Sequence, residues 1–248
     1  MTPLEAIDHV ATVLRELWSG DMVFVGGAVV GLLLTDPAAP SPRYTDDVDV
    51  VIGPVSRAAF NQLEARLREA GHTQPTEGPI CRWHIVGTNV DLMPVDAAIL
   101  GFSNRWYGAM MGRAIEFPVA PGRVVRIVSP PYLLATKLEA FADRGAGDYL
   151  FSQDIGDIIA LVDGRPELVN EVHAADSEAR TFVCNGFRRL LDDARFEEAI
   201  PAHLMPDRAS QSRVPLILER MHGVARGDGP NASDAPQATR PEGAGEAD

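Results

Sequence analysis

The chain has 248 residues, 46% of them hydrophobic, and a formal net charge of −13. Its length fits one large domain or two small ones, with enough apolar side chains for a hydrophobic core. A surface this acidic repels phosphate groups and argues against non-specific binding of nucleic acid.

The first half of the chain predicts alternating helices and strands. Residues 3–19 have the apolar stripe of an amphipathic helix, with Thr2 as its N-cap and Glu5 completing a capping box. The segments that follow predict a strand at 22–25, a helix at 28–34, a strand at 48–52, a helix from Ser56 to about 70, a hairpin of 81–86 and 89–93 around Gly87-Thr88, and a second hairpin of 114–119 and 124–127.

The second half predicts helices only. They are expected at 133–141, 154–162, 166–173, 176–193 and 214–221. The predicted fold is therefore α/β (α+β), with a domain at 1–128 built on a small mixed sheet and a helical domain at 129–225. Residues 226–248 hold almost no large apolar side chains and predict a disordered tail.

The two cysteines and the N-terminus predict a cytoplasmic protein. Cys81 and Cys184 lie far apart without a C-x-x-C partner, which disfavours a disulfide scaffold or a structural zinc site. The N-terminus lacks a basic and apolar signal sequence, and no stretch is long and apolar enough to span a membrane.

The acids at the start of the strand at 48–52 carry the clearest chemical signal. Asp47 and Asp49 are two residues apart, so a strand presents both carboxylates on one face. Adjacent carboxylates repel each other unless a cation lies between them, and hard oxygen ligands favour Mg²⁺ or Mn²⁺. An isolated pair of this kind is equally often a solvated strand edge, but here the strand continues as Val-Val-Ile.

A third carboxylate is available on a later strand. Asp91 lies between apolar residues, where a lone acid is costly unless it meets a charge. We expect it beside Asp49, forming a site suited to metal-assisted phosphoryl or nucleotidyl transfer. Asp96 is the rival candidate for this role.

The glycine pair Gly26-Gly27 follows the first strand and would let a backbone approach phosphate closely. A tight turn is the commoner meaning of such a pair. A dinucleotide-binding oxidoreductase is disfavoured because the G-x-G-x-x-G spacing is not met, and a P-loop because its motif does not occur.

Lys137 is the only lysine of the chain and falls in a predicted helix. Arg144 follows it, and then Asp154 and Asp157 lie about one helical turn apart. A lysine is usually a surface residue, and two such acids on a solvated face carry no function. The rarity of lysine here makes a functional role equally plausible.

Together these features resemble the DNA polymerase β-like nucleotidyltransferase superfamily, and within it the AbiEii family of type IV toxins, which includes the MenT-type enzymes. The resemblance spans about residues 22–163. The superfamily pattern is matched by Gly26, Gly27, Asp47, Asp49 and Asp91, and the narrower family pattern by Arg43, Thr45, Lys137 and Asp154.

The resemblance implies an enzyme that transfers NMP from a nucleoside triphosphate to a hydroxyl, releasing pyrophosphate. The implied acceptor is RNA, at the 3′ end of tRNA, and a cognate antitoxin is an implied partner. Asp47, Asp49 and Asp91 would bind Mg²⁺ or Mn²⁺, with Asp91 also helping to activate the acceptor. Gly26 and Gly27 would cradle phosphate and Lys137 would contact it, while Arg43 and Thr45 would shape the nucleotide site and Asp154 would order Lys137 or the acceptor.

Two alternatives stay open. The acceptor could be a protein hydroxyl or a small molecule, because the acidic chain suits a large RNA only if arginines form a basic groove. The candidates for it are Arg105, Arg113, Arg123, Arg126, Arg188 and Arg189. The chain could also be an inactive binding module of the same fold.

Position 46 departs from the family pattern, in which a basic residue is expected. Because side chains alternate along a strand, we expect Asp46 to point away from the site.

Overall fold

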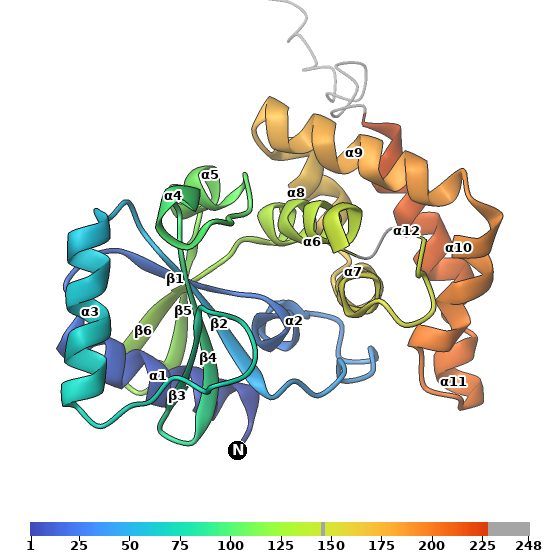
Figure 1. The fold of residues 1–248 in the computed structure, drawn as a ribbon. Coiled ribbons are helices and arrows are strands. Elements are labelled where there is room, and N and C mark those ends of the chain that lie inside the picture. The colour runs from blue at the N-terminus through green and yellow to red at the C-terminus, as the bar shows by residue number, and fades with distance from the viewer. Residues whose placement is uncertain (145–146, 228–248) are drawn as a thin grey trace, which may run out of the picture.

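The computed structural model describes residues 1–144 and 147–227, which form a mixed α/β fold (Figure 1). Its six-stranded sheet has the order β3-β4-β2-β1-β6-β5 and both parallel and antiparallel pairs. The strands are β1 (Met22–Val25), β2 (Asp47–Ile52), β3 (Arg82–Ile85), β4 (Thr88–Pro94), β5 (Ile115–Ala120) and β6 (Arg123–Ile127). The predicted mixed sheet with helices is confirmed.

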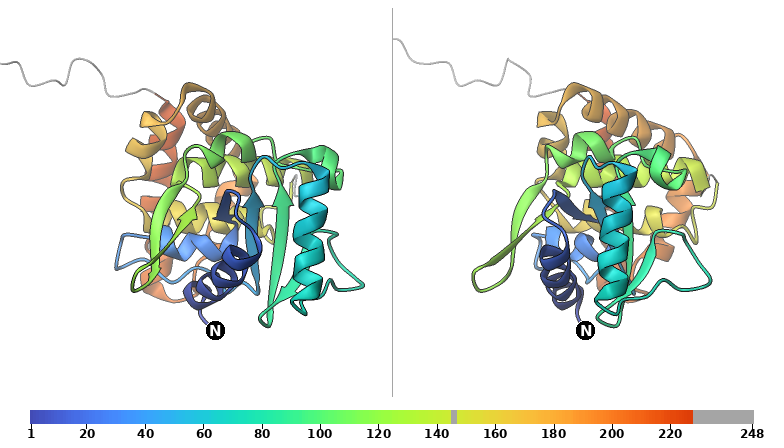
Figure 2. Two further views of the ribbon diagram at one scale, coloured as in Figure 1. Left: turned by 90° about the vertical axis from the view of Figure 1, so that its left-hand side faces the viewer. Right: turned by 60° about the vertical axis from the view of Figure 1, so that its left-hand side comes forward.

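Helices cover both faces of this sheet. Those of the first half are α1 (Pro3–Leu17), α2 (Gly27–Leu33), α3 (Arg57–Glu69), α4 (Ala97–Leu100) and α5 (Tyr107–Met111). Those of the second half are α6 (Pro130–Arg144), α7 (Gln153–Gly164), α8 (Leu168–Ala174), α9 (Ser177–Leu191), α10 (Ala194–Ala199), the 3₁₀ helix η1 (Ile200–His203), α11 (Arg208–Gln211) and α12 (Val214–Arg226). Helices α1 and α3 lie on one face, and the helical second half lies beyond the other (Figure 2).

Local sequence signals account for the elements of the first half. The Thr2–Glu5 capping box begins α1, and the Ser56 hydroxyl caps α3, both as predicted. The strands β3 and β4 pair antiparallel, as do β5 and β6, so both predicted hairpins are confirmed. Strand β1 and residues 50–52 of β2 are apolar and lie at the centre of the sheet, where their side chains meet helices on both sides.

The structure corrects several expected boundaries. The first hairpin turns at Val86-Gly87, one residue earlier than predicted, so Thr88 already belongs to β4. Helix α6 starts at Pro130, before the predicted start at residue 133. Proline is compatible with the first turn of a helix, so Pro130 and Pro131 do not delay it. The predicted tail starts inside the last turn of α12, which continues to Arg226, and its residues 228–248 lie outside the described part of the chain.

Within residues 1–144 and 147–227, none of the helices combines the length and the apolar character that crossing a bilayer requires.

Candidate active site

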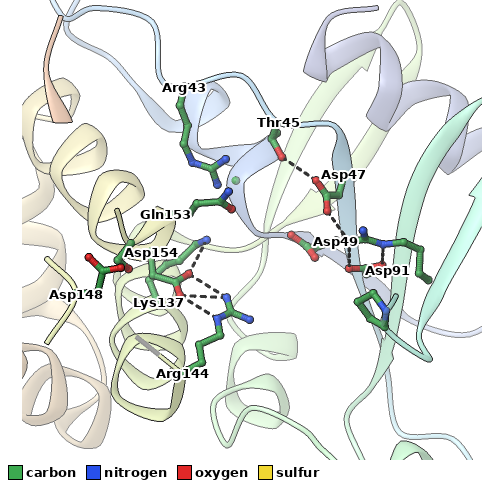
Figure 3. Close-up of a pocket in the computed structure, with 14 residues that line it drawn as sticks. Arg43, Thr45, Asp47, Asp49, Asp91, Lys137, Arg144, Asp148, Gln153 and Asp154 are labelled. Atoms are coloured by element: carbon green, nitrogen blue, oxygen red, sulfur yellow. Dashed lines mark hydrogen bonds and ion pairs between the residues drawn. The ribbon is translucent and has the colours of Figure 1, made fainter. Parts of the chain in front are cut away.

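A cleft of about 490 Å³ lies between the sheet and the helical second half. Strands β2 and β4 supply one wall, and helices α6 and α7 supply the other (Figure 3). Eight of the nine residues singled out from the sequence line this cleft: Gly27, Arg43, Thr45, Asp47, Asp49, Asp91, Lys137 and Asp154. Residues separated by more than a hundred positions in the chain therefore meet at one place.

The sheet wall is acidic because of strand register. Asp47 and Asp49 lie two residues apart on β2, and Asp91 on the parallel strand β4 is the direct neighbour of Asp49. Residues paired in this way point to the same face of a sheet, so the three carboxylates share one face. The rival Asp96 instead caps α4 through the Ala98 amide and does not line the cleft.

Among the residues that the structure describes, none pairs with the carboxylate of Asp49. No hydrogen bond or ion pair of Asp49 is found among residues 1–144 and 147–227. The pKa of Asp49 is raised to about 6, chiefly by burial; Lys137 opposes this rise, and the neighbouring charges of Asp91 and Asp47 add to it. An unpaired carboxylate beside two others is the electrostatic situation that a bound cation relieves.

A side chain that the sequence did not bring to attention, Arg82 of β3, completes the acidic wall. Its guanidinium nitrogens lie 2.8 Å from each oxygen of Asp91 and 2.6 Å from an oxygen of Asp47. Hydrogen bonding to Asp91 raises the pKa of Arg82, so the guanidinium stays charged. Arg82 thus neutralises part of the charge that this wall concentrates.

The helical wall is built around the buried ammonium of Lys137 on α6. Its Nζ lies 3.1 Å from Asp154 and 2.6 Å from Asp157, both buried on α7. Burial alone would lower the pKa of Lys137, but the carboxylates of Asp157 and Asp154 outweigh burial and raise it. Lys137 is therefore a permanent cation held in one place.

Two arginines extend this positive wall. Arg43 donates to both oxygens of Asp157, at 3.1 and 3.3 Å, and Arg144 donates to both oxygens of Asp154. These arginines and Lys137 are paired with Asp154 and Asp157, and a third acid, Asp148, also lines the cleft on this side. The cations of this wall face the acidic wall across the cleft (Figure 3).

The glycine pair fits closely against both walls. Gly26 has φ of 74°, and a Cβ there would lie 1.7 Å from an oxygen of Asp49. A Cβ on Gly27 would lie 2.9 Å from the guanidinium of Arg43. Gly26 borders a smaller cavity that Asp49 and Lys137 also line, and it does not line the main cleft. Its nearest neighbour is the carboxylate of Asp49.

Two residues next to the acid pair point in different directions. The Thr45 hydroxyl is 3.4 Å from Asp47, inside the cleft. Asp46 lines a neighbouring hollow and not the cleft, as the alternation of side chains predicts. Its negative charge is therefore directed away from the cleft.

The donor set of the acidic wall fits a divalent metal ion in its chemistry. Three carboxylates with hard oxygen atoms converge, and one of them, Asp49, has no partner among the described residues. As the side chains of the described residues stand, however, no three acids, histidines or cysteines are arranged around a common metal position. Arg82 instead engages oxygens of Asp47 and Asp91.

Neither the models of known protein families nor the curated protein sequences gave a match for this chain. What the cleft does has to follow from the chemistry of its own residues.

Two charged residues of the site were given no role in the sequence interpretation. Arg82 stands on an edge strand of ordinary composition, and only its register with Asp91 reveals its role. Asp157 was noticed as one helical turn from Asp154, and its importance depends on burial. The sequence feature that could have identified Asp157 is the spacing of two acids on a helix otherwise rich in Ile, Leu and Val.

Proposed function

We propose that this chain is a divalent-metal-dependent nucleotidyltransferase with the fold of the DNA polymerase β-like superfamily. The observation that carries the proposal is the separation of charge across one cleft, with Asp47, Asp49 and Asp91 on one wall and Arg43, Lys137 and Arg144 on the other. A nucleoside triphosphate with its divalent cation presents matching charges, because its phosphates need cations and its metal needs carboxylates.

The roles follow from the position of each side chain. Asp47 and Asp49 would hold Mg²⁺ or Mn²⁺, and a divalent ion bound there supplies neutralisation of the charge on the phosphate oxygens. Lys137 suits phosphate oxygens, because Asp154 and Asp157 hold its ammonium group in one place. Arg43 and Arg144 offer planar donor groups that match phosphate geometry.

The proposed reaction is substitution at the α-phosphorus. An acceptor hydroxyl oxygen forms a bond to this phosphorus as the bond to the pyrophosphate oxygen breaks, and pyrophosphate leaves. The hydroxyl proton passes to a carboxylate of the acidic wall, for which Asp91 is the candidate. The contribution of the chain is chiefly position and electrostatics, as in other phosphoryl transfers.

The family resemblance extends this proposal to an RNA acceptor, the 3′ end of tRNA, and to a toxin with a cognate antitoxin. The arginines expected to form a basic groove support an RNA acceptor only weakly, because four of them are already paired with acids. These pairs are Arg105–Glu139, Arg113–Asp176, Arg123–Asp8 and Arg126–Asp21. A protein hydroxyl or a small molecule is therefore kept as an alternative acceptor.

A second candidate function is a binding module without catalytic activity. The specific observation in its favour is Arg82, which neutralises Asp47 and Asp91 without any metal. A charge cluster satisfied in this way can be purely structural.

Label transfer separates the candidates. The purified protein is incubated with each α-³²P-labelled nucleoside triphosphate, Mg²⁺ and a cell extract. Asp49→Asn serves as the inactive variant, and Asp46→Asn, which changes a nearby acid that does not line the cleft, as its matched control. Metal-dependent labelling is expected with the wild type and Asp46→Asn but not with Asp49→Asn.

The fate of the label identifies the acceptor. Label removed by RNase indicates RNA, label removed by protease indicates a protein, and label resistant to both indicates a small molecule. Equal results for wild type and Asp49→Asn, without metal-dependent transfer in any fraction, would overturn the enzyme proposal in favour of the binding module.

A further inference from the structure

The guanidinium of Arg82 occupies the space between two carboxylates of the acidic wall. One nitrogen, Nη2, lies 2.6 Å from Asp47 and 2.8 Å from Asp91, and Nε lies 2.8 Å from the other oxygen of Asp91. Both oxygens of Asp91 and one of Asp47 are therefore engaged. Of the three acids, only Asp49 is left without a cation at hydrogen-bonding distance within the described residues.

The register of three neighbouring strands produces this arrangement. Arg82 on β3 pairs with Asp91 on β4, and Asp91 pairs with Asp49 on β2. The three side chains therefore stand in a row on one face of the sheet. Strand β3 is at the edge, and the Arg82 side chain is 23% exposed, so it has solvent to move into without disturbing the core.

A divalent ion at this wall needs the same oxygen atoms that Arg82 now binds. Mg²⁺ and Mn²⁺ prefer carboxylate oxygens, and a guanidinium cannot share their lone pairs in the same direction. The two cations also repel each other at this distance. Arg82 and a metal ion are therefore alternatives at Asp47 and Asp91.

We propose that Arg82 is a resident counter-cation, which holds the carboxylates of the metal-free protein together and is displaced from Asp47 and Asp91 when a divalent cation binds. This inference rests on the proposed function. It gives Arg82 two effects: it stabilises the empty cleft against the repulsion of three acids, and it weakens the binding of metal that arrives without substrate. Arg82 is thus a positioning residue that tunes metal affinity.

The test measures metal binding rather than turnover. Mn²⁺ is titrated into the wild type, Arg82→Gln and Arg113→Gln, and free Mn²⁺ is followed by its electron paramagnetic resonance signal. Arg113→Gln is the matched control, because it removes an equally close arginine–aspartate fork, to Asp176, that lies outside the cleft. Arg82→Gln is expected to bind Mn²⁺ at least about tenfold more tightly than wild type, within the range by which partners of metal ligands alter affinity, and Arg113→Gln to bind as wild type does.

Two further variants keep the test decisive. Arg82→Lys keeps the charge but loses the fork, so a smaller gain in the same direction is expected even if Arg82→Gln does not fold. In the double variant Arg82→Gln/Asp49→Asn the gain should vanish, which places the tighter site at these acids. Unfolding temperatures should agree: Arg82→Gln is less stable than wild type in EDTA and recovers with Mn²⁺.

The two levels of the proposal fail differently. If the wild type shows metal-dependent label transfer but Arg82→Gln and Arg82→Lys bind Mn²⁺ no more tightly than wild type, the role of Arg82 is wrong and the enzyme stands. If no variant binds Mn²⁺ and the wild type transfers no label, the proposed function fails and the inference falls with it.

Discussion

The ammonium of Lys137 lies closer to Asp157, at 2.6 Å, than to Asp154, at 3.1 Å. Asp157 also binds Arg43 through both of its oxygens. It therefore fixes two of the three cations that the proposed site offers to phosphate, one from α6 and one from the loop before β2. The carboxylate that organises the positive wall is thus buried behind the cleft and does not line it.

Replacing this carboxylate should affect both stability and substrate binding. In Asp157→Asn, Arg43 loses its charged partner, and Lys137 is left with Asp154 alone. Removing one partner of a buried ion pair costs about 3–5 kcal/mol, and because Asn keeps the shape we expect a loss of about 2–4 kcal/mol in the free energy of unfolding. We also expect the KM for the nucleoside triphosphate to rise by about tenfold or more, since each misplaced phosphate contact costs about 1.5–3 kcal/mol.

The control for this variant stands on the same helix. Asp163 is buried like Asp157 and pairs with Arg213 at 2.6 Å, but it does not line the cleft. Asp163→Asn should lower the unfolding free energy comparably in urea titrations while leaving the KM for the triphosphate unchanged. An Asp157→Asn variant with normal KM would show that the positive wall does not bind phosphate.

Patterns along the chain were enough to predict the acidic wall. Strand alternation placed Asp47 and Asp49 on one face, and an acid among apolar residues indicated that Asp91 would join them. Both expectations depend on the alternation of residue types along the sequence, because successive side chains of a strand point to opposite faces of the sheet. Register between the strands was the only missing step, and β2 and β4 pair so that Asp49 and Asp91 are neighbours.

The partners of these residues could not be predicted in the same way. Arg82 acts through a pairing between β3 and β4, and a one-residue shift of this hairpin would direct its side chain to the other face. Asp157 acts through the packing of α6 against α7, which decides whether an acid on a helix is buried or solvated. The short helices α4, α5, α10 and α11 were missed for a related reason, because one or two turns are too few to display periodicity.

We expect that replacing the Asp49 carboxylate by an amide makes the metal-free protein more stable than wild type and inactive. The pKa of Asp49 is raised from 3.8 to about 6, mainly by burial. A shift of this size corresponds to about 3 kcal/mol at most, so Asp49→Asn should raise the unfolding free energy of the metal-free protein by about 1–3 kcal/mol at pH 8. Asp46→Asn, at an exposed position just before β2, should change it little.

The same shift predicts how this difference depends on pH. Because the folded protein holds the Asp49 proton more tightly than the unfolded chain, the stability contributed by this group is complete below pH 3.8 and is lost as pH rises through about 6. The advantage of Asp49→Asn should therefore be largest above pH 6 and shrink as pH falls toward 4. Urea titrations in EDTA measure it, and an Asp49→Asn protein less stable than wild type at pH 8 would mean that the carboxylate has a stabilising partner.

The contact between Gly26 and Asp49 predicts that a single methyl group inactivates the site. In Gly26→Ala, the new Cβ would lie 1.7 Å from an oxygen of Asp49, so the carboxylate has to move away from its place beside Asp91. A displacement of about 1 Å in a catalytic group costs about a hundredfold in rate. We expect a loss of label transfer of this size, together with weaker Mn²⁺ binding.

Gly122 separates this steric effect from backbone strain. Its φ of 72° nearly equals the 74° of Gly26, but a Cβ there would meet nothing within 4 Å. Gly26→Ala and Gly122→Ala should both lose about 1–3 kcal/mol of stability, because an L-residue is strained at positive φ, whereas only Gly26→Ala should lose Mn²⁺ binding. If both variants bind Mn²⁺ equally well, the place of Asp49 beside the glycine is irrelevant to the metal, and Asp47 and Asp91 would have to hold the metal without it.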